Sequence, residues 1–299
     1  MSRHLGAALL FTGSIVAASC SSGDTLQNAA PRVESPSPSP RNATSLAGAW
    51  RPSARPAGAP MGSEWVTITT FDGSPLTAAV FAPPGTGPAP VAIYLYFNQP
   101  DLNTNVGLLQ RDLDFVASLA KDGFLAVTVC WQAATVGADD FCGPNLPRSG
   151  GDVIKDLAVV ADAVRTFPRA RADRVGLLAR SAAANPALLA AARGARVSSV
   201  VSISASYGGE GSAAQSRYGT TVFNEIDGLK VPILVVHGTQ DRWAPGSLIT
   251  SAEAYVRACR AKGKIVETIY VDGADDTLLF SPTYWTPDVM RALTDFIRR

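Results

Sequence analysis

Ser181 is the residue from which chemistry in this sequence can start, because a serine hydroxyl becomes a nucleophile when its surroundings activate it. The apolar run Val175–Ala179 precedes it and the apolar segment Ala187–Ala192 follows it, a pattern that predicts a strand, a sharp turn and a helix. Residues 179–183 are Ala-Arg-Ser-Ala-Ala, which matches the G-x-S-x-G turn of nucleophilic serines with alanine at both glycine positions. An ordinary turn that contains a serine fits the same residues, so this pattern leaves both interpretations open.

Two carboxylates follow predicted strands later in the chain. Asp241 comes after the strand that ends at His237, and Asp276 lies in the loop after the strand that ends at Val271. Ligands of open parallel sheets bind at the carboxyl ends of the strands, where Ser181 is also expected. The order along the chain is therefore a nucleophile, an acid and then the loop in which a base would lie.

This order and the serine turn resemble the α/β-hydrolase superfamily, whose catalytic residues follow one another as Ser, Asp and His. The resemblance extends from about Glu64 to the C-terminus and is greatest to small members without a lid, similar to dienelactone hydrolases and esterases. It implies that Ser181 is the nucleophile and that Asp241 is the acid that orients the base.

The resemblance also implies the other parts of a hydrolase site. The backbone N–H groups of Ala182 and of Phe97 or Asn98 correspond to the oxyanion hole. The position that should hold the catalytic histidine is occupied by Asp276. His237 matches the histidine at the start of an H-G-x-x-D segment, which has a structural role in relatives.

Histidine is scarce in this chain, which contains only His4 and His237. A nucleophilic serine needs a hydrogen-bonded base, and Asp276, with a reference pKa of about 4, is a far weaker base than imidazole. In a working triad, loss of the histidine lowers turnover on the order of a millionfold. We therefore expect hydrolysis by the ordinary triad to be absent or very slow, unless an unusual loop brings His237 to Ser181.

Three hypotheses about function follow from these residues. The first is a serine hydrolase for small ester or acyl substrates with an impaired site. The second is a non-catalytic pseudoenzyme that acts as a cell-surface binding module. The third is a Ca²⁺ or Mg²⁺ site built from Asp241, Asp275 and Asp276. Since no spacing here matches a metal motif, solvated aspartates explain them better, and we expect neither a metal nor a cofactor.

Three residues near the expected site have two interpretations each. Arg180 either pairs with Asp276 and keeps it ionised, or is a solvated residue of the turn, as arginine commonly is. Trp131 and Gln132 either line the site or pack beneath the loop that joins Cys130 to Cys142.

The elements that must position these residues alternate between strands and helices. An initial antiparallel pair followed by β-α repeats predicts an α/β fold with a mostly parallel, doubly wound, eight-stranded sheet, helices on both faces and no large lid. The strands are expected at Trp65–Thr70, Leu76–Phe81, Val91–Tyr96, Phe124–Cys130, Val175–Ala179, Val197–Ser204, Pro232–His237 and Ile265–Val271. The helices are expected at Leu108–Lys121, Asp152–Phe167, Ala187–Arg193, Gly246–Lys262 and Thr286–Arg299.

The chain begins with segments that are not expected to belong to this fold. Residues 1–20 have a basic start, a short apolar run and small residues before Cys20, which is typical of a signal peptide with a lipobox-like end. Residues 21–62 are rich in Ser, Pro and Ala and are expected to form a disordered tether. The domain is then 63–299. We expect an exported protein, held at a membrane only by acyl chains on Cys20 or otherwise secreted or periplasmic.

Composition limits the partners. The formal net charge is +1 with no basic block, which argues against nucleic acid. We expect a monomer whose partner is a small ester or acyl compound. In an oxidising compartment Cys130 and Cys142 can form a disulfide, and Cys259 is expected to be buried and free.

Overall fold

The computed structural model describes residues 48–96, 108–131, 141–142, 149–208, 212–242, 248–275, 279, 281 and 283–299, which all belong to the compact unit Asn42–Arg299. The strands are β1 (Trp50–Ser53), β2 (Ser63–Thr69), β3 (Pro75–Phe81), β4 (Ala89–Leu95), β5 (Leu125–Val129), β6 (Ala170–Arg180), β7 (Ser199–Ile203), β8 (Ile233–Gly238) and β9 (Val266–Val271). The helices are α1 (Gln110–Lys121), α2 (Gly150–Val164), α3 (Ala184–Ala192), α4 (Ala213–Tyr218), α5 (Leu248–Ala261) and α6 (Pro287–Arg298). Two short 3₁₀ helices are η3 (Ser181–Ala183) and η4 (Ile226–Gly228).

These strands form one sheet in the order β1-β2-β3-β5-β4-β6-β7-β8-β9. β1, β2 and β3 pair antiparallel, and β3 is also antiparallel to β5. From β5 to β9 every neighbouring pair is parallel. The mostly parallel α/β sheet predicted from the sequence is confirmed, and each of the eight predicted strands is present.

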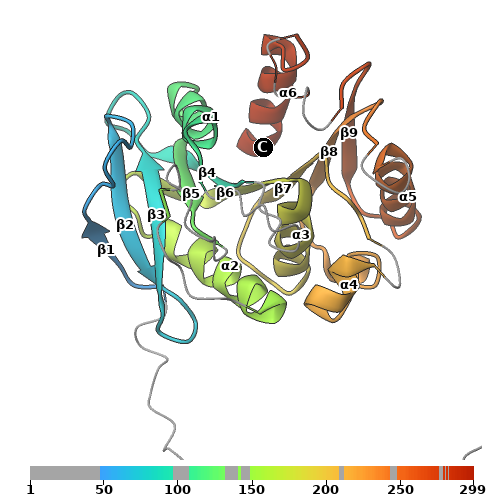
Figure 1. Cartoon of the computed structure of the whole chain (residues 1–299), viewed down its shortest axis with the longest axis horizontal. Coiled ribbons are helices and arrows are strands. Elements are labelled where there is room, and N and C mark those ends of the chain that lie inside the picture. Colours follow the sequence, from blue (N-terminus) through green and yellow to red (C-terminus); the bar gives the residue numbers. More distant parts are fainter. Residues whose placement is uncertain are drawn as a thin grey trace, which may run out of the picture. The chain divides into compact units, whose positions relative to one another are not determined.

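The parallel strands are apolar on both faces because helices cover both faces. All residues of β5, β7 and β8 are buried. Figure 1 shows α1 and α6 on one side of the sheet and α2 and α3 on the other. Gly176 of β6 allows α6 to approach, since a Cβ atom there would lie 2.4 Å from Cγ2 of Ile297.

The start of the domain differs from the prediction. The expected tether 21–62 contains β1, which adds a ninth described strand to the predicted eight by pairing antiparallel with β2. The Trp50 indole N–H donates to the hydroxyl of Thr166 at 3.0 Å, and its ring packs edge-on against Phe167 with centroids 4.8 Å apart. The tether prediction is thus wrong for this strand, because four residues that include a proline carry too little hydrophobic pattern to reveal it. Residues 1–47, with the predicted leader and Cys20, lie outside the described residues.

The segment between β7 and β8 is short. Its described residues form α4, which was not predicted, and η4, and they leave no room for a large lid. Within the ranges given above, no helix is both long enough and apolar enough to cross a membrane.

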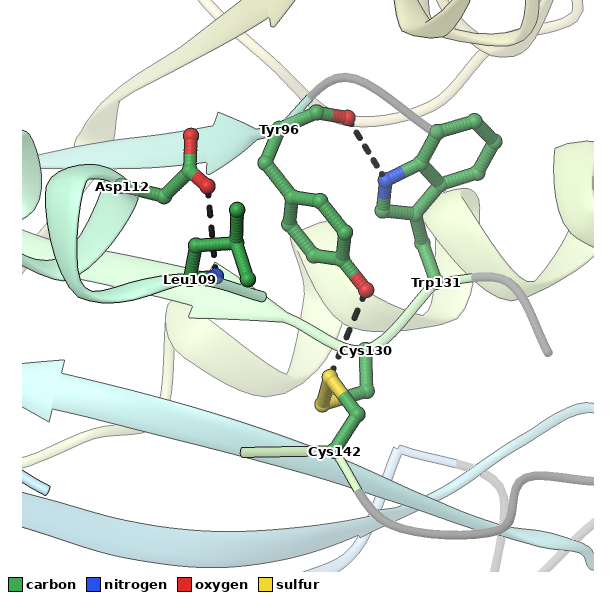
Figure 2. The surroundings of a disulfide bond; sticks show 6 residues. All are labelled: Tyr96, Leu109, Asp112, Cys130, Trp131 and Cys142. Carbon is green, nitrogen blue, oxygen red and sulfur yellow. Dashed lines mark hydrogen bonds between the residues drawn. A yellow bond between two sulfur atoms is a disulfide. The ribbon is translucent and has the colours of Figure 1, made fainter. Parts of the chain in front are cut away.

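The cysteines behave as predicted. Cys130, directly after β5, forms a disulfide with Cys142, and the two Cα atoms are 5.5 Å apart. Cys259 in α5 is buried and free. Figure 2 shows the disulfide next to Tyr96 and Trp131, at the edge of the sheet where the parallel strands end.

Candidate active site

Ser181 lies in a sharp turn between a buried strand and a buried helix. Arg180 ends β6 in an extended conformation, with φ −101° and ψ 134°. Ser181 then has a φ of +52°, in the left-handed region, and η3 leads directly into α3. A non-glycine residue in this region is strained by about 1–3 kcal/mol, and such strain persists where the surrounding structure enforces it. This is the geometry that exposes a nucleophilic serine at the end of a strand.

Small residues make this turn possible. Ala179 and Ala183 are completely buried on either side of the serine, while Ser181 and Ala182 are partly exposed. Larger side chains at the two buried positions would have to displace a packed core. Alanine therefore fits where glycine is usual, and the interpretation of residues 179–183 as a serine elbow agrees with the geometry.

A second strained serine lies beside the first. Arg180 and Ile203 are register partners on β6 and β7, and the next residue on each strand, Ser181 and Ser204, has a positive φ. Ser204 has a φ of +45° and is completely buried. Asn185 of α3 donates its side-chain N–H to the carbonyl of Ser206 at 2.9 Å, which ties the elbow helix to the chain that leaves β7.

The Ser181 hydroxyl makes no hydrogen bond to a base among the residues that the structure describes. Acyl transfer by a serine requires such a base within hydrogen-bond reach. Ser181 thus has the conformation expected of a nucleophilic serine, and no side chain among the described residues is hydrogen-bonded to its hydroxyl as a base.

His237 has the surroundings of a structural residue, as expected from its place at a strand end. Its ring is completely buried at the end of β8. Nε2 lies 3.3 Å from the Ala205 carbonyl oxygen, and Nδ1 lies 3.2 Å from the Gly238 carbonyl oxygen. Both ring nitrogens of His237 face backbone carbonyls, so neither is hydrogen-bonded to Ser181. This arrangement does not support the alternative in which His237 is the base.

Asp241 follows β8 and is almost completely buried, with 1% of its surface exposed. Its Oδ2 atom is 3.6 Å from Nδ1 of His237. Its backbone N–H donates to the Gly238 carbonyl at 3.3 Å, which turns the chain back toward the strand end. The acid predicted from the sequence therefore lies at the end of β8, held in a tight turn.

The turn that carries Asp241 is joined to the loop that follows β9. The backbone N–H groups of Thr239 and Gln240 donate to the carbonyls of Val271 and Ala274, at 3.0 and 2.9 Å. The approach requires Gly238, because a Cβ atom there would lie 2.3 Å from the Ala274 carbonyl oxygen. The loop that follows β9, in which the sequence predicts the base, thus starts directly beside the turn that carries Asp241.

Several predicted site residues lie outside the described residues. These are Asp276 at the expected histidine position, Phe97 and Asn98 of the expected oxyanion hole, and Gln132. Among the described residues, no group of three or more His, Cys, Asp or Glu side chains could hold a metal ion. The aspartate metal site of the third hypothesis includes Asp276, which lies outside the described residues.

A buried polar group behind the elbow was not predicted. Tyr94 of β4 donates its hydroxyl to Asp112 of α1 at 3.3 Å, and the backbone N–H of Leu109 donates to the same carboxyl at 3.3 Å. Burial raises the pKa of Asp112, and the positive charges of Arg111 and Arg180 oppose this rise. Burial also raises the pKa of Tyr94, and the nearby Asp112 carboxylate adds to the rise.

Arg180 is therefore not a solvated residue of the turn, because only 9% of its surface is exposed. That interpretation is wrong, since the residue ends a buried strand and its charge acts on Asp112 and Tyr94. The sequence did contain a signal for this group. Asp112 interrupts the apolar face of α1 next to Leu113 and Val116, where only a partnered carboxyl can be buried.

Trp131 packs in the core, with 2% of its surface exposed. Of the two interpretations left open for this residue, the burial agrees with core packing, and the loop residues 132–140 lie outside the described residues. The Trp131 indole N–H donates to the Tyr96 carbonyl at 3.1 Å.

No protein-family model matches the sequence, and no curated protein matches it. Solved structures share its arrangement of strands and helices. A protein from Klebsiella pneumoniae assigned as a dienelactone hydrolase has a TM-score of 0.60 at 17% identity, over 84% of this chain and 98% of that one. Esterase 2 of Thermogutta terrifontis has a TM-score of 0.59 at 14% identity, over 80% of this chain and 95% of that one.

A longer protein is similar over one part only. Dipeptidyl peptidase 4 of Porphyromonas gingivalis has a TM-score of 0.60 at 15% identity, over 79% of this chain, which spans 35% of that protein. At such low identities a structural likeness establishes the fold and leaves the reaction open. Together with the sheet order and the serine elbow, these likenesses show that the unit Asn42–Arg299 has the α/β-hydrolase fold.

Proposed function

We propose that this protein is a serine hydrolase scaffold for small ester or acyl compounds, with Ser181 as its nucleophile and with slow turnover. The observation that carries the proposal is the left-handed conformation of Ser181, at φ +52°, between β6 and η3. Strain of this kind clusters at active sites, and at Ser181 it coincides with a serine that is partly exposed at the carboxyl end of a central parallel strand.

In the proposed reaction, the Ser181 hydroxyl adds to the acyl carbonyl and gives up its proton to a base. The backbone N–H of Ala182 and that of Phe97 or Asn98 would stabilise the oxyanion that forms. The alcohol then leaves with a proton, and water hydrolyses the acyl-enzyme to release the acid and restore the serine. Asp241 would orient the base that serves both proton transfers.

The base is the weak part of this scheme. With Asp276 in place of imidazole, proton transfer from a serine hydroxyl at neutral pH is strongly unfavourable. His237 does not replace it, because its ring nitrogens face the carbonyls of Ala205 and Gly238. We therefore expect a rate far below that of a complete triad.

The burial of His237 also favours a second candidate, a binding module that keeps the fold and has lost the reaction. A serine elbow without a base can hold an acyl compound through the same backbone N–H groups without cleaving it. The two candidates differ in one measurable property, Ser181-dependent turnover.

The test is hydrolysis of a short-chain chromogenic ester by the parent, Ser181→Ala, Asp276→His and the double variant. We expect a very slow parent and a gain of at least a hundredfold in Asp276→His that is lost when Ser181→Ala is added. Asp275→His is the matched control, because it adds a histidine to the same loop one position earlier, and it should gain nothing. A fast parent that depends on Ser181 would overturn the placement of the base, and His237 would be the next residue to change.

If neither the parent nor Asp276→His shows any turnover that depends on Ser181, the hydrolase proposal fails. Binding of the same ester without turnover, measured by calorimetry, would then support the binding module.

We further propose that the protein is exported and held at a membrane by acyl chains on Cys20. The composition of residues 1–20 supports this, and so does the disulfide between Cys130 and Cys142, because disulfides persist in oxidising compartments. The tether would set where the domain resides, and the domain alone would carry the chemistry.

A further inference from the structure

Three of the five lysines in the sequence gather around one residue, Asp227 of η4. Lys230 comes before β8, Lys262 follows α5, and Lys264 comes before β9. Nζ of Lys262 lies 2.6 Å from Oδ2 of Asp227. Lys230 and Lys264 donate to the backbone carbonyl of Asp227, at 3.2 and 2.9 Å. Figure 1 shows β8, β9 and α5, next to which these lysines lie, together at one edge of the sheet.

Positive charge is in excess at this place. Among the described residues, Lys262 is the one lysine of the three that forms an ion pair. The other two donate to carbonyl oxygens, which carry no net charge. Arg260 adds a fourth cation, and its guanidinium also donates to a carbonyl, that of Val266 at 3.2 Å. The excess is local, because the formal net charge of the whole chain is only +1.

An exposed isoleucine lies in the same segment. Ile265 follows Lys264 directly, and 65% of its surface is exposed. Its backbone carbonyl accepts the N–H of Ile233 at 3.0 Å, which fixes it at the start of β9. A single exposed apolar residue needs no explanation, but one within a group of cations combines two chemistries on one surface. We call Lys230, Arg260, Lys262, Lys264 and Ile265 the basic edge.

The basic edge lies at the end of the sheet opposite to Ser181. The strands β6, β7, β8 and β9 are all parallel. Lys230 and Lys264 come before the first residues of β8 and β9, whereas Ser181 follows the last residue of β6. A strand of six residues is about 20 Å long, so the length of the sheet separates the two places.

The chemistry of the basic edge selects its partner. Cations at the end of a helix are stabilised by the helix dipole, which accounts for Arg260 and Lys262 but not for Lys230 or the exposed Ile265. Nucleic acid would attract the cations but offers no apolar phase to the isoleucine. An anionic bilayer offers both, since its phosphates attract ammonium groups and its acyl chains accept an aliphatic side chain.

We propose that the basic edge docks on the surface of an anionic phospholipid bilayer, so that the end of the sheet with Ser181 faces away from the membrane. Residues 21–47 would span at most about 90 Å, which is long enough for this face of the domain to reach a membrane to which Cys20 is anchored. The contact is weak and reversible, so a salt wash releases a chain that lacks the acyl anchor. The proposal goes beyond the proposed function and does not depend on turnover.

The test is co-sedimentation with phospholipid vesicles, using the chain that begins at Ser21. This chain keeps every described element and lacks both the apolar run of residues 5–18 and Cys20, so only its other surfaces can bind. One set of vesicles contains phosphatidylcholine alone, and the other contains phosphatidylglycerol as well. We expect binding to the second set and not to the first, and weaker binding as the salt concentration rises.

The decisive variant is Lys262→Gln with Lys264→Gln. Each cation close to an anionic bilayer strengthens binding about fivefold, so this variant should bind roughly 10- to 30-fold more weakly. The matched control is Lys121→Gln with Lys155→Gln, which changes the net charge equally at two exposed lysines outside the basic edge. It should bind like the parent. Ile265→Ser should weaken binding about threefold or more.

Nitroxide labels test the orientation of the docked domain. A label on Ile265→Cys should become shielded from a water-soluble relaxation agent when vesicles are added. A label on Gln240→Cys, which is exposed just beyond the other end of β8, should stay accessible. Because Cys259 is buried and the other two cysteines of this chain form the disulfide, each label reaches only the introduced cysteine.

Three results would overturn the proposal. The first is a folded parent that does not bind vesicles with phosphatidylglycerol, or two lysine variants that lose binding equally. The second is self-association without vesicles that Lys262→Gln with Lys264→Gln abolishes, because the basic edge would then bind a second copy of this chain. The third is shielding of the label at residue 240 and not at residue 265. None of these results depends on ester hydrolysis, so failure of the proposed function is recognised separately.

Discussion

At the scale of the residue, Asp112 of α1 is a buried carboxyl whose favourable interactions do not fully offset the cost of removing its charge from water. Its carboxyl accepts hydrogen bonds from Tyr94 and from the Leu109 backbone. Burial nevertheless raises its pKa, and the charges of Arg111 and Arg180 offset only part of this effect. A carboxyl whose pKa is raised on folding binds its proton more tightly in the folded state, so ionisation of Asp112 destabilises the protein.

The sign of the pH dependence follows from this shift. The contribution of Asp112 to stability is complete below the unfolded pKa of about 3.9 and is lost as the pH rises through the folded pKa. Asp112→Asn, which is neutral at every pH, should therefore be more stable than the parent at pH 7, by about 1.4 kcal/mol for each tenfold increase in proton affinity that folding gives the Asp112 carboxyl. The gain should shrink to nothing near pH 4.

Urea unfolding of Asp112→Asn at several pH values between 4 and 8 measures this difference. Asp114→Asn is the control, because Asp114 lies on the exposed side of the same helix. If Asp112→Asn were less stable than the parent at pH 7, the carboxylate would be stabilised by the arginines, and the argument from burial would be wrong.

Single residues also show what could be predicted from the sequence. The elbow was recognisable because Ser181 stands between two apolar runs, and the structural role of His237 followed from its place at a strand end. The burial of Arg180 was not predictable from its own type, since arginine is mostly exposed and its partner Asp112 is distant in sequence. That partner could have been suspected from a carboxylate on the apolar face of a helix.

At the scale of the element, the strands and helices with a strong hydrophobic pattern were predicted and the weak ones were not. All residues of β5, β7 and β8 are buried, and such continuous apolar runs are easy to detect. β1 has four residues and α4 has six, so each depends on contacts with other segments for its formation. Those contacts are tertiary, and local sequence does not encode them.

The contact between the loops after β8 and β9 is of the same kind. Nothing next to Gly238 in the sequence indicates that the Ala274 carbonyl will lie where its Cβ atom would be, at 2.3 Å. Gly238→Ala must therefore separate the loop that carries Asp241 from the loop that follows β9, or strain both of them. We expect a loss of about 1–3 kcal/mol in the free energy of unfolding, as in other overpacked cores.

Urea unfolding checks this, with Gly87→Ala as the control, since a Cβ atom on Gly87 meets nothing within 4 Å. That control should be neutral or slightly stabilising. Equal stability of Gly238→Ala and Gly87→Ala would show that the two loops adjust easily and that their close approach is not required.

At the scale of the whole molecule, one boundary in the chain divides it into two parts with different proposed roles. The N-terminal segment is proposed to hold the protein at a membrane, and the compact unit is proposed to carry out the reaction. The compact unit begins at Asn42, about twenty residues before the start predicted from composition at residue 63. β1 lies within residues 21–62, in which Ser, Pro and Ala dominate as a whole, so composition did not reveal this strand. Chains that begin at Asn42 and at Ser63 distinguish the two boundaries.

The chain that begins at Asn42 should unfold at the same urea concentration as the full chain, because it retains every described element. The chain that begins at Ser63 lacks β1, exposes the edge of β2 and loses the packing of Trp50 against Phe167. Removing a packed tryptophan costs about 3 kcal/mol or more, and Trp50 is only partly buried, so a loss of roughly 2–3 kcal/mol is expected. Trp50→Ala in the Asn42 chain should reproduce most of this loss. Cell fractionation of the same chains should leave only the full one with membranes. If the Ser63 chain were as stable as the Asn42 chain, β1 would be dispensable and the boundary predicted from composition would be the correct one.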